Sequence, residues 1–333
     1  MPSRAETDVE AALAAVEAED APLAEKVEML MEMAMGLQIR PRSPDDLLCS
    51  VQLYEAALGL CPPELYLLRG RIHARLATAL QAIPAEDLGP LQSARQNLET
   101  ARDILKHEGA PEELAEIEMN LGLVFQSLAA ANAAPITAAI QAYQRALRTF
   151  DAHAFPREYA ILQNNLATAF LSIPFSDERG KMREALAVQA FQDGLKIVNI
   201  IDHPTEYAML QNNLGNALQY ASSSHSVENC LRALDAYDEA LKVRTRAATP
   251  IEYANTLSNY ANCLRNLPDD VARPERGNAE NLDHALRRYR EAEEIFAAFG
   301  EGQKVAVVAE MIAEIEAESA QFPPASERAV GVQ

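Results

Sequence analysis

Small and aromatic residues recur along the chain at the spacing of one helix face. A small residue, an aromatic residue or leucine four places later, and a small residue three places after that occur together six times. Positions i, i+4 and i+7 share one side of an α-helix, where small side chains let a neighbouring helix approach and the ring fills the space between. The pattern predicts six packed helices, marked by Ser50/Tyr54/Ala57, Ala94/Leu98/Ala101, Ala139/Tyr143/Ala146, Ala187/Phe191/Gly194, Ala233/Tyr237/Ala240 and Ala285/Tyr289/Ala292.

Prolines divide the chain into units of similar length. Five of them are separated by 48, 45, 48 and 46 residues: Pro63, Pro111, Pro156, Pro204 and Pro250. Proline fits the first turn of a helix, where its missing N–H would be unpaired anyway, and it disfavours helix in the residue before it. The pattern within each unit therefore predicts two antiparallel helices. The first, helix A, begins at the proline, and the second, helix B, carries the small–aromatic–small pattern.

The predicted elements fill most of the chain. We predict an N-terminal cap over residues 1–21, which contains a helix at 7–19. At the other end we predict a C-terminal cap over 300–321, which contains a helix at 302–321, followed by a flexible tail at 322–333. Between them we predict helix pairs at 22–37/45–60, 63–81/87–107, 111–130/135–152, 156–172/180–200, 204–221/227–247 and 250–266/279–299. The corresponding units are 22–60, 63–107, 111–152, 156–200, 204–247 and 250–299. Loop 267–280 is the longest and most charged, and we expect it to be disordered.

The paired signatures resemble the tetratricopeptide repeat family. Helix A carries a leucine or tyrosine followed by glycine or alanine, and helix B carries Ala-x-x-x-Tyr/Phe-x-x-Ala, clearly over 63–299 and in degenerate form over 22–60. The units are about a dozen residues longer than the 34-residue consensus. Gln163–Ala167 and Gln211–Gly215 resemble the long repeats of kinesin light chains and their bacterial relatives. The resemblance implies an all-α, right-handed superhelical solenoid whose concave wall is lined by the A helices.

Asparagine recurs at one position of the A helices. Asn120, Asn165, Asn213 and Asn259 each stand directly before the apolar residue of the motif. Asparagine suits a helix interior poorly because its side chain competes for backbone hydrogen bonds, so its recurrence needs a cause. A carboxamide complements a peptide group, and the resemblance implies that this ladder grips the backbone of a bound peptide. The alternative is that the asparagines bridge neighbouring helices within the scaffold.

Polar neighbours extend this ladder into an amide-rich groove with basic ends. A solvated helix face would more often carry Lys and Glu. The family's carboxylate clamp needs a basic residue one turn before each asparagine. This clamp is absent here, because the residues at those positions are Leu68, Glu116, Ile161, Met209 and Asn255. The predicted partner-binding residues are Asn120, Asn164, Asn165, Thr168, Asn212, Asn213, Asn216, Asn255, Asn259, Asn262, Arg71, Arg75, Gln126, Gln219 and Arg265.

The charge balance narrows the class of partner. The chain has 29 basic and 49 acidic side chains and a formal charge of −20. This disfavours nucleic acid and anionic membrane surfaces as partners, because both are bound by basic patches. The expected partner is another protein, whose extended or helical segment is neutral to mildly acidic where it lies in the groove. The alternative partner is a second copy of the chain.

No catalytic site, metal site or cofactor is predicted. The chain lacks G-x-x-x-x-G-K-[ST], H-E-x-x-H and G-x-S-x-G, which carry phosphate, zinc and acyl-transfer chemistry. The four cysteines have no C-x-x-C spacing and are expected to be buried thiols: Cys49, Cys61, Cys230 and Cys263. Residues 1–20 do not read as a signal peptide, and no apolar run is long enough to span a bilayer, so we expect a cytoplasmic protein.

Two further segments stand out by composition. The run Met29–Met35 contains four methionines, whose flexible thioethers suit either an irregular core in the first repeat or an adaptable contact surface. The basic cluster Lys242–Arg246 lies among acidic residues and is expected to form surface ion pairs. Together these features favour a non-catalytic adaptor or assembly factor. The alternatives are a self-associating repeat protein and a sensory or regulatory module.

Overall fold

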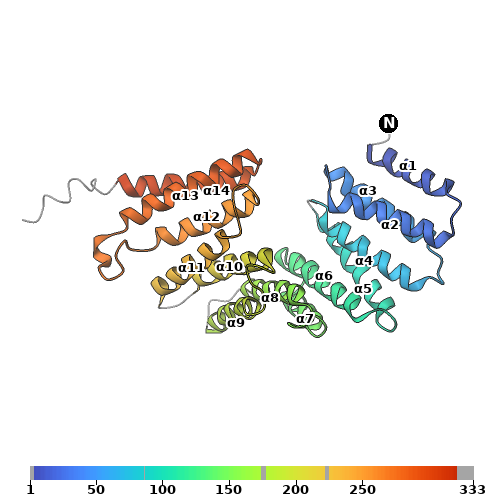
Figure 1. The fold of residues 1–333 in the computed structure, drawn as a ribbon, viewed down its shortest axis with the longest axis horizontal. Coiled ribbons are helices and arrows are strands. Elements are labelled where there is room, and N and C mark those ends of the chain that lie inside the picture. Colours follow the sequence, from blue (N-terminus) through green and yellow to red (C-terminus); the bar gives the residue numbers. More distant parts are fainter. Residues whose placement is uncertain (1–3, 86, 174–177, 222–224, 321–333) are drawn as a thin grey trace, which may run out of the picture. The chain divides into compact units, whose positions relative to one another are not determined.

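The computed structural model describes residues 4–85, 87–173, 178–221 and 225–320, and most of these residues lie in α-helices (Figure 1). These residues form 14 α-helices and one 3₁₀ helix, and no strand. The helices are α1 (Arg4–Ala18), α2 (Leu23–Ile39), α3 (Pro44–Leu60), α4 (Tyr66–Ala82), α5 (Gly89–Leu105), α6 (Pro111–Ala130), α7 (Ile136–Ala146), α8 (Pro156–Leu171), α9 (Glu178–Leu195), α10 (Pro204–Gln219), α11 (Ser226–Leu241), α12 (Pro250–Arg265), η1 (Pro274–Arg276), α13 (Ala279–Ala298) and α14 (Gly302–Ala320). The all-α fold class is confirmed.

The chain divides into two compact units, residues 1–155 and 156–333. In the N-terminal unit, the A helices α2, α4 and α6 pack against the B helices α3, α5 and α7, and α1 packs on α3 and α2. In the C-terminal unit, α8, α10 and α12 pack against α9, α11 and α13, and α14 packs on α13. The six predicted helix pairs are therefore present, each made of one A helix and the B helix that follows it. The predicted tail, 322–333, lies outside the described residues.

The aromatic residue of each B helix fills the space that the small residues leave. Tyr143 and Tyr237 are fully buried. Each ring lies against a glycine of its own A helix. A Cβ atom at Gly122 would come within 2.2 Å of the Tyr143 ring, and one at Gly215 within 2.5 Å of the Tyr237 ring. Because such distances exclude a methyl group, glycine is required at both positions for the helices to approach.

Three B helices end earlier than predicted. The sequence predicts helix to residues 152, 200 and 247, whereas α7, α9 and α11 end at Ala146, Leu195 and Leu241. The chain continues as turns, in which the N–H groups of Phe150, Val198 and Arg244 donate to carbonyl groups four residues earlier at 3.0, 3.1 and 2.9 Å. Apolar periodicity alone does not separate such turns from helix, because both present a residue to the core.

The loop that was expected to be disordered is folded. Within 267–280, the Asp269 N–H donates to the Gly277 carbonyl at 2.9 Å. The Asp269 carboxylate accepts hydrogen bonds from the N–H groups of Glu280 and Asn281 at 3.1 and 2.8 Å, where α13 begins. The Asn281 side chain donates to the carbonyl groups of Leu267 and Pro268, at 3.1 Å each. Short polar side chains thus satisfy the loop backbone locally, which composition alone did not reveal.

Candidate functional site

Two of the three ladder asparagines of the C-terminal unit, Asn213 and Asn259, hydrogen-bond to asparagines on neighbouring A helices, whereas Asn165 accepts a bond from Asn164 on its own helix. The Asn213 amide donates to the Asn164 oxygen at 2.7 Å, from α10 to α8. The Asn259 amide donates to the Asn212 oxygen at 3.3 Å, from α12 to α10. Asn164 and Asn212 are only 7% and 6% exposed. In this unit the amide groups therefore bridge the A helices of successive repeats.

The same network continues to Arg244, a partly buried arginine that sequence reasoning missed. The Arg244 guanidinium donates to the Thr256 hydroxyl at 2.9 Å, and that hydroxyl lies 3.1 Å from the Asn212 oxygen. Burial lowers the pKa of Arg244. The equivalent positions in the repeat before hold the buried apolar pair Val198 and Leu210, so a polar contact replaces an apolar one. The expected surface ion pairs hold for Lys242 with Glu239 and for Arg246 with two glutamates, but not for Arg244.

A second set of predicted groove residues accepts hydrogen bonds from the buried tyrosines. Tyr143 donates to Gln126 at 2.9 Å. Burial raises the pKa values of Tyr143, Tyr237 and Tyr289, which keeps their hydroxyl groups protonated as donors. The remaining pairs are Tyr237 with Asn216 at 2.7 Å and with Gln219 at 2.9 Å, and Tyr289 with Asn262 at 2.5 Å.

The sequence carries a signal for these tyrosine–amide pairs. In the repeat formed by α8 and α9, the buried ring is Phe191, which has no hydroxyl group. The position of that A helix equivalent to Gln126 and Gln219 is Leu171. Loss of the donor thus accompanies loss of the acceptor, because a buried polar group without a partner is costly.

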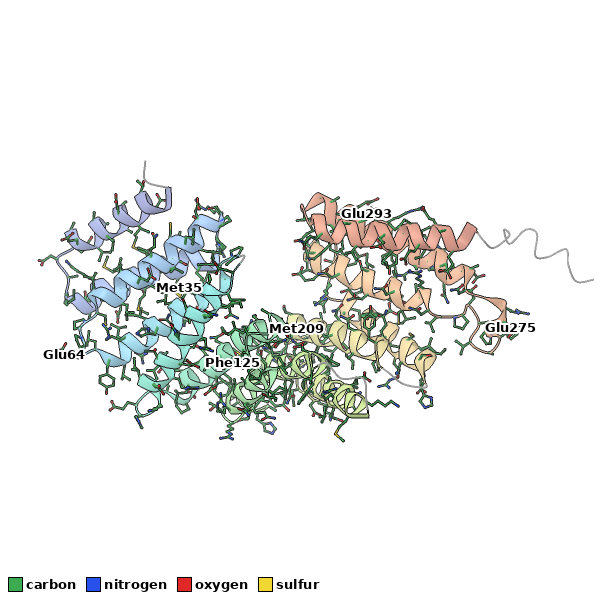
Figure 2. All side chains as sticks on the ribbon, turned by 180° about the vertical axis from the view of Figure 1, so that it is seen from behind. Met35, Glu64, Phe125, Met209, Glu275 and Glu293 are labelled. Atoms are coloured by element: carbon green, nitrogen blue, oxygen red, sulfur yellow. The ribbon has the colours of Figure 1, made fainter. Side chains whose placement is uncertain are left out.

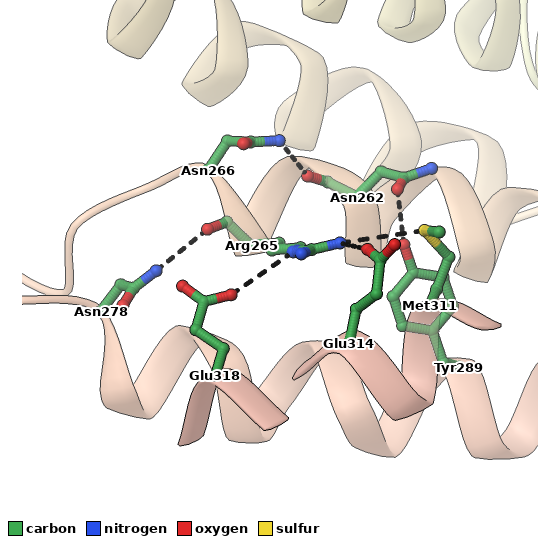
Figure 3. A network of polar contacts seen from close by, with 8 residues as sticks. All are labelled: Asn262, Arg265, Asn266, Asn278, Tyr289, Met311, Glu314 and Glu318. Atoms are coloured by element: carbon green, nitrogen blue, oxygen red, sulfur yellow. Dashed lines mark hydrogen bonds and ion pairs between the residues drawn. The ribbon is translucent and has the colours of Figure 1, made fainter. Parts of the chain in front are cut away.

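The basic end predicted at Arg265 is covered by the last helix (Figure 3). The Arg265 guanidinium lies 2.6 Å from the Glu314 carboxylate and 3.6 Å from that of Glu318, both on α14. The hydrogen bond to Glu314 raises the pKa of Arg265. The Asn278 side chain also donates to the Arg265 carbonyl at 3.0 Å. Arg265 therefore fastens α14 to α12.

The N-terminal unit differs, because two of its predicted groove residues have no side-chain partner among the described residues. These are Arg75 on α4 and Asn120 on α6, and both line a hollow of about 340 Å³. Arg71 lines the same hollow and forms an ion pair with Glu113 at 2.6 Å. The hydrogen bond from Arg71 lowers the pKa of Glu113. The structure thus brings Arg71, Arg75 and Asn120 together around one hollow.

The methionine run divides between core and surface. Met29 and Met31 pack against the core of the N-terminal unit, whereas Met33 and Met35 are each 39% exposed. Met31 and Met35 line a second hollow, of about 260 Å³, which shares Met31, Arg71 and Arg75 with the first. The core alternative is therefore confirmed for Met29 and Met31, and an adaptable contact surface stays a prediction for Met33 and Met35.

Two further predicted groove residues, Thr168 and Asn255, differ in their contacts. The Thr168 hydroxyl donates to the Asn165 carbonyl at 2.9 Å, and Asn255 has no side-chain partner in the described part of α12. All four cysteines are buried free thiols, as predicted. The described residues hold no cluster of three His, Cys, Asp or Glu side chains that could bind a metal ion. None of the described helices is long and apolar enough to cross a membrane.

No protein-family model and no curated protein matches the chain. Similar solved structures include a thermophilic TPR protein of Thermus thermophilus, with 17% identity, 74% of this chain and 98% of that chain covered, and a TM-score of 0.45. BtubC (BKLC) from P. vanneervenii has 17% identity, coverage of 92% and 95%, and a TM-score of 0.40. A tetratricopeptide repeat protein from Parabacteroides merdae has 15% identity, coverage of 87% and 98%, and a TM-score of 0.40. This similarity concerns the fold alone, which is the TPR-like stack of helix pairs described above.

Proposed function

We propose that the chain is a non-catalytic scaffold, an adaptor or assembly factor, which holds an extended or helical segment of another protein against its A helices. One observation carries the proposal. On the N-terminal unit, the A helices α2, α4 and α6 line two adjoining hollows of about 340 and 260 Å³. Rows of side chains on parallel helices suit a segment that lies across them, because successive residues of the segment meet successive helices.

The open polar groups support a peptide as the ligand. The guanidinium of Arg75 offers donors for a backbone carbonyl, and the amide of Asn120 offers both donors and an acceptor. Neither group has a side-chain partner among the described residues. We assign direct contact with the partner to these two residues. The asparagines of α8 and α10, which bond to one another, act by holding the A helices in register.

The proposal is tested by selecting binders from a displayed peptide library and measuring their affinities for variants. Ala74 lines the larger hollow, so Ala74→Trp should fill it and weaken the selected peptides at least about tenfold. Ala297 is exposed on α13, and Ala297→Trp serves as the matched control. Circular dichroism establishes that both variants retain their helicity, and Asn120→Ala gives a milder probe of the same hollow.

Two results would overturn the proposal. One is a selection that returns no binder. The other is a set of binders that Ala74→Trp and Asn120→Ala leave as tight as the wild type. Asn165→Ala combined with Asn213→Ala separates the ladder from the hollows, since we expect this pair to lower stability more than affinity.

A further inference from the structure

The two adjoining hollows carry an apolar floor and a charged rim. We call the surface formed by Glu28, Met31, Glu32, Met35, Arg75 and Glu116 the methionine–glutamate face. Met35, labelled in Figure 2, lies in the second half of α2 and is 39% exposed. Ile117 and Leu68 line the hollows beside the methionines. Thioether side chains adapt to aliphatic groups of varied shape, so this floor suits aliphatic side chains of a partner.

The rim has an excess of negative charge that the unit does not neutralise. Arg71 is paired with Glu113 at 2.6 Å, so these two charges compensate each other. The rest of the rim consists of the exposed carboxylates of Glu28, Glu32 and Glu116 and the exposed guanidinium of Arg75. In the described chain, none of these three carboxylates has a basic side chain within ion-pair distance. Three carboxylates against one guanidinium leave a negative rim.

We infer that the methionine–glutamate face takes a basic segment of a partner protein, in which lysine or arginine alternates with aliphatic residues. This deepens the proposed function, on which it rests, by stating the chemistry of the partner. Basic side chains would lie between Glu28 and Glu32 on α2 and opposite Glu116 on α6, while aliphatic side chains contact Met31 and Met35. An acidic segment would gain one contact, with Arg75, and meet three like charges. The sequence had suggested a neutral to mildly acidic partner, and the geometry points to the opposite sign.

The sign of the charge is tested with synthetic probes. Three fluorescent peptides share one set of leucine positions and carry lysine, glutamine or glutamate at all other positions. Fluorescence anisotropy with the full chain at about 0.15 M salt should show the lysine peptide binding at least about tenfold tighter than the glutamine peptide. The glutamate peptide should bind most weakly. Equal or tighter binding of the glutamine or glutamate peptide would overturn the inference.

A matched pair of variants distinguishes binding at the methionine–glutamate face from attraction of the peptide by the net charge of the chain. Glu28→Gln/Glu32→Gln/Glu116→Gln removes three negative charges from the face, and should weaken the lysine peptide about tenfold or more. Asp235→Asn/Glu275→Gln/Glu310→Gln removes three negative charges from exposed positions of the C-terminal unit, and should weaken it less than about twofold. Equal weakening by both variants would show that only the net charge of the chain attracts the peptide.

A second pair of variants tests the apolar floor without changing charge. Met33 and Met35 lie on the same helix and are each 39% exposed, but of these two residues Met35 alone lines one of the two adjoining hollows. Met35→Ala should weaken the lysine peptide about three- to tenfold, and Met33→Ala should leave it unchanged. Equal effects of both changes would contradict the inference.

The library selection distinguishes failure of this inference from failure of the proposed function. Selected peptides that are blocked by Ala74→Trp but lack basic residues would leave the scaffold function standing and overturn the basic partner. An absence of any binder would overturn both.

Discussion

The A helices of the two units use similar polar residues in different ways. In residues 156–333, Asn213 follows Asn212 on α10, and these amides bond to Asn164 on α8 and Asn259 on α12. In residues 1–155, Asn120 follows Met119 on α6, and no described side chain bonds to its amide. The amides of Asn213 and Asn259 therefore join A helices of successive repeats, whereas the amide of Asn120 joins no other helix that the structure describes.

Removing a bridging asparagine should be the most damaging test of this contrast. Asn212 is 6% exposed and bonds to Asn213, Thr256 and Asn259. Asn212→Ala removes all three of these hydrogen bonds from a buried position, so the free energy of unfolding should fall by about 2–3 kcal/mol. Asn120→Ala should change it by less than about 0.5 kcal/mol. Urea unfolding measures both, and equal losses would remove the distinction between the units.

The two arginines of the predicted groove offer the next test. Arg265 holds two carboxylates of α14, whereas Arg75 has no side-chain partner among the described residues. Arg265→Gln should destabilise the docking of α14 by about 1 kcal/mol, a partly exposed pair being worth no more. Backbone amides of α14 should then exchange hydrogen about fivefold faster in mass spectrometry. Arg75→Gln should leave the exchange of its own unit unchanged, and faster exchange there would show that Arg75 is structural.

The tyrosine–amide pairs allow one repeat to be converted to the chemistry of another. Tyr143→Phe alone leaves the Gln126 oxygen without its 2.9 Å donor and should lower the free energy of unfolding by about 1 kcal/mol. Tyr143→Phe with Gln126→Leu reproduces the Phe191 and Leu171 combination of α8 and α9, and should recover most of that loss. A double variant that is less stable than the single one would contradict the pairing.

The sequence predicted the starts of the later A helices well, because a proline marks each of them, but it placed the start of α4 at Pro63, three residues before Tyr66. Proline opens the A helices from α6 onward at the expected residue, since Pro111, Pro156, Pro204 and Pro250 each begin a helix. The ends of α7, α9 and α11 were placed too late, because a turn closed by backbone hydrogen bonds buries Phe150 as a helix would.

The site was less predictable than the fold. Recurrence of Asn120, Asn165, Asn213 and Asn259 marks a position, but what each amide bonds to depends on the residue that faces it from the next repeat. Gln126 and Gln219 could have been assigned from the sequence, because they accompany tyrosine in helix B. The contacts of Arg244 could not have been assigned in this way, because they depend on the geometry of a turn that the local sequence does not predict.

The smallest expected effect concerns the ion pair between Arg71 and Glu113, which borders the larger of the two adjoining hollows. The hydrogen bond from Arg71 lowers the pKa of Glu113. A carboxyl group whose folded pKa lies below its unfolded value of about 4.3 contributes stability above that pH, and loses it as the pH falls through the folded pKa. Arg71 is half exposed, so the contribution at neutral pH should be about 0.5 kcal/mol.

Urea unfolding of the wild type and Glu113→Gln between about pH 7 and pH 3 measures this contribution, because the difference between the two proteins should vanish toward the acid end. Glu116→Gln is the matched control, since Glu116 borders the same hollow and has no basic partner among the described residues. The difference in the free energy of unfolding between Glu116→Gln and the wild type should not vanish toward the acid end. If Glu116→Gln shows the acid-dependent loss and Glu113→Gln does not, the two carboxylates have exchanged roles, and Glu116 rather than Glu113 would be closed to a basic partner.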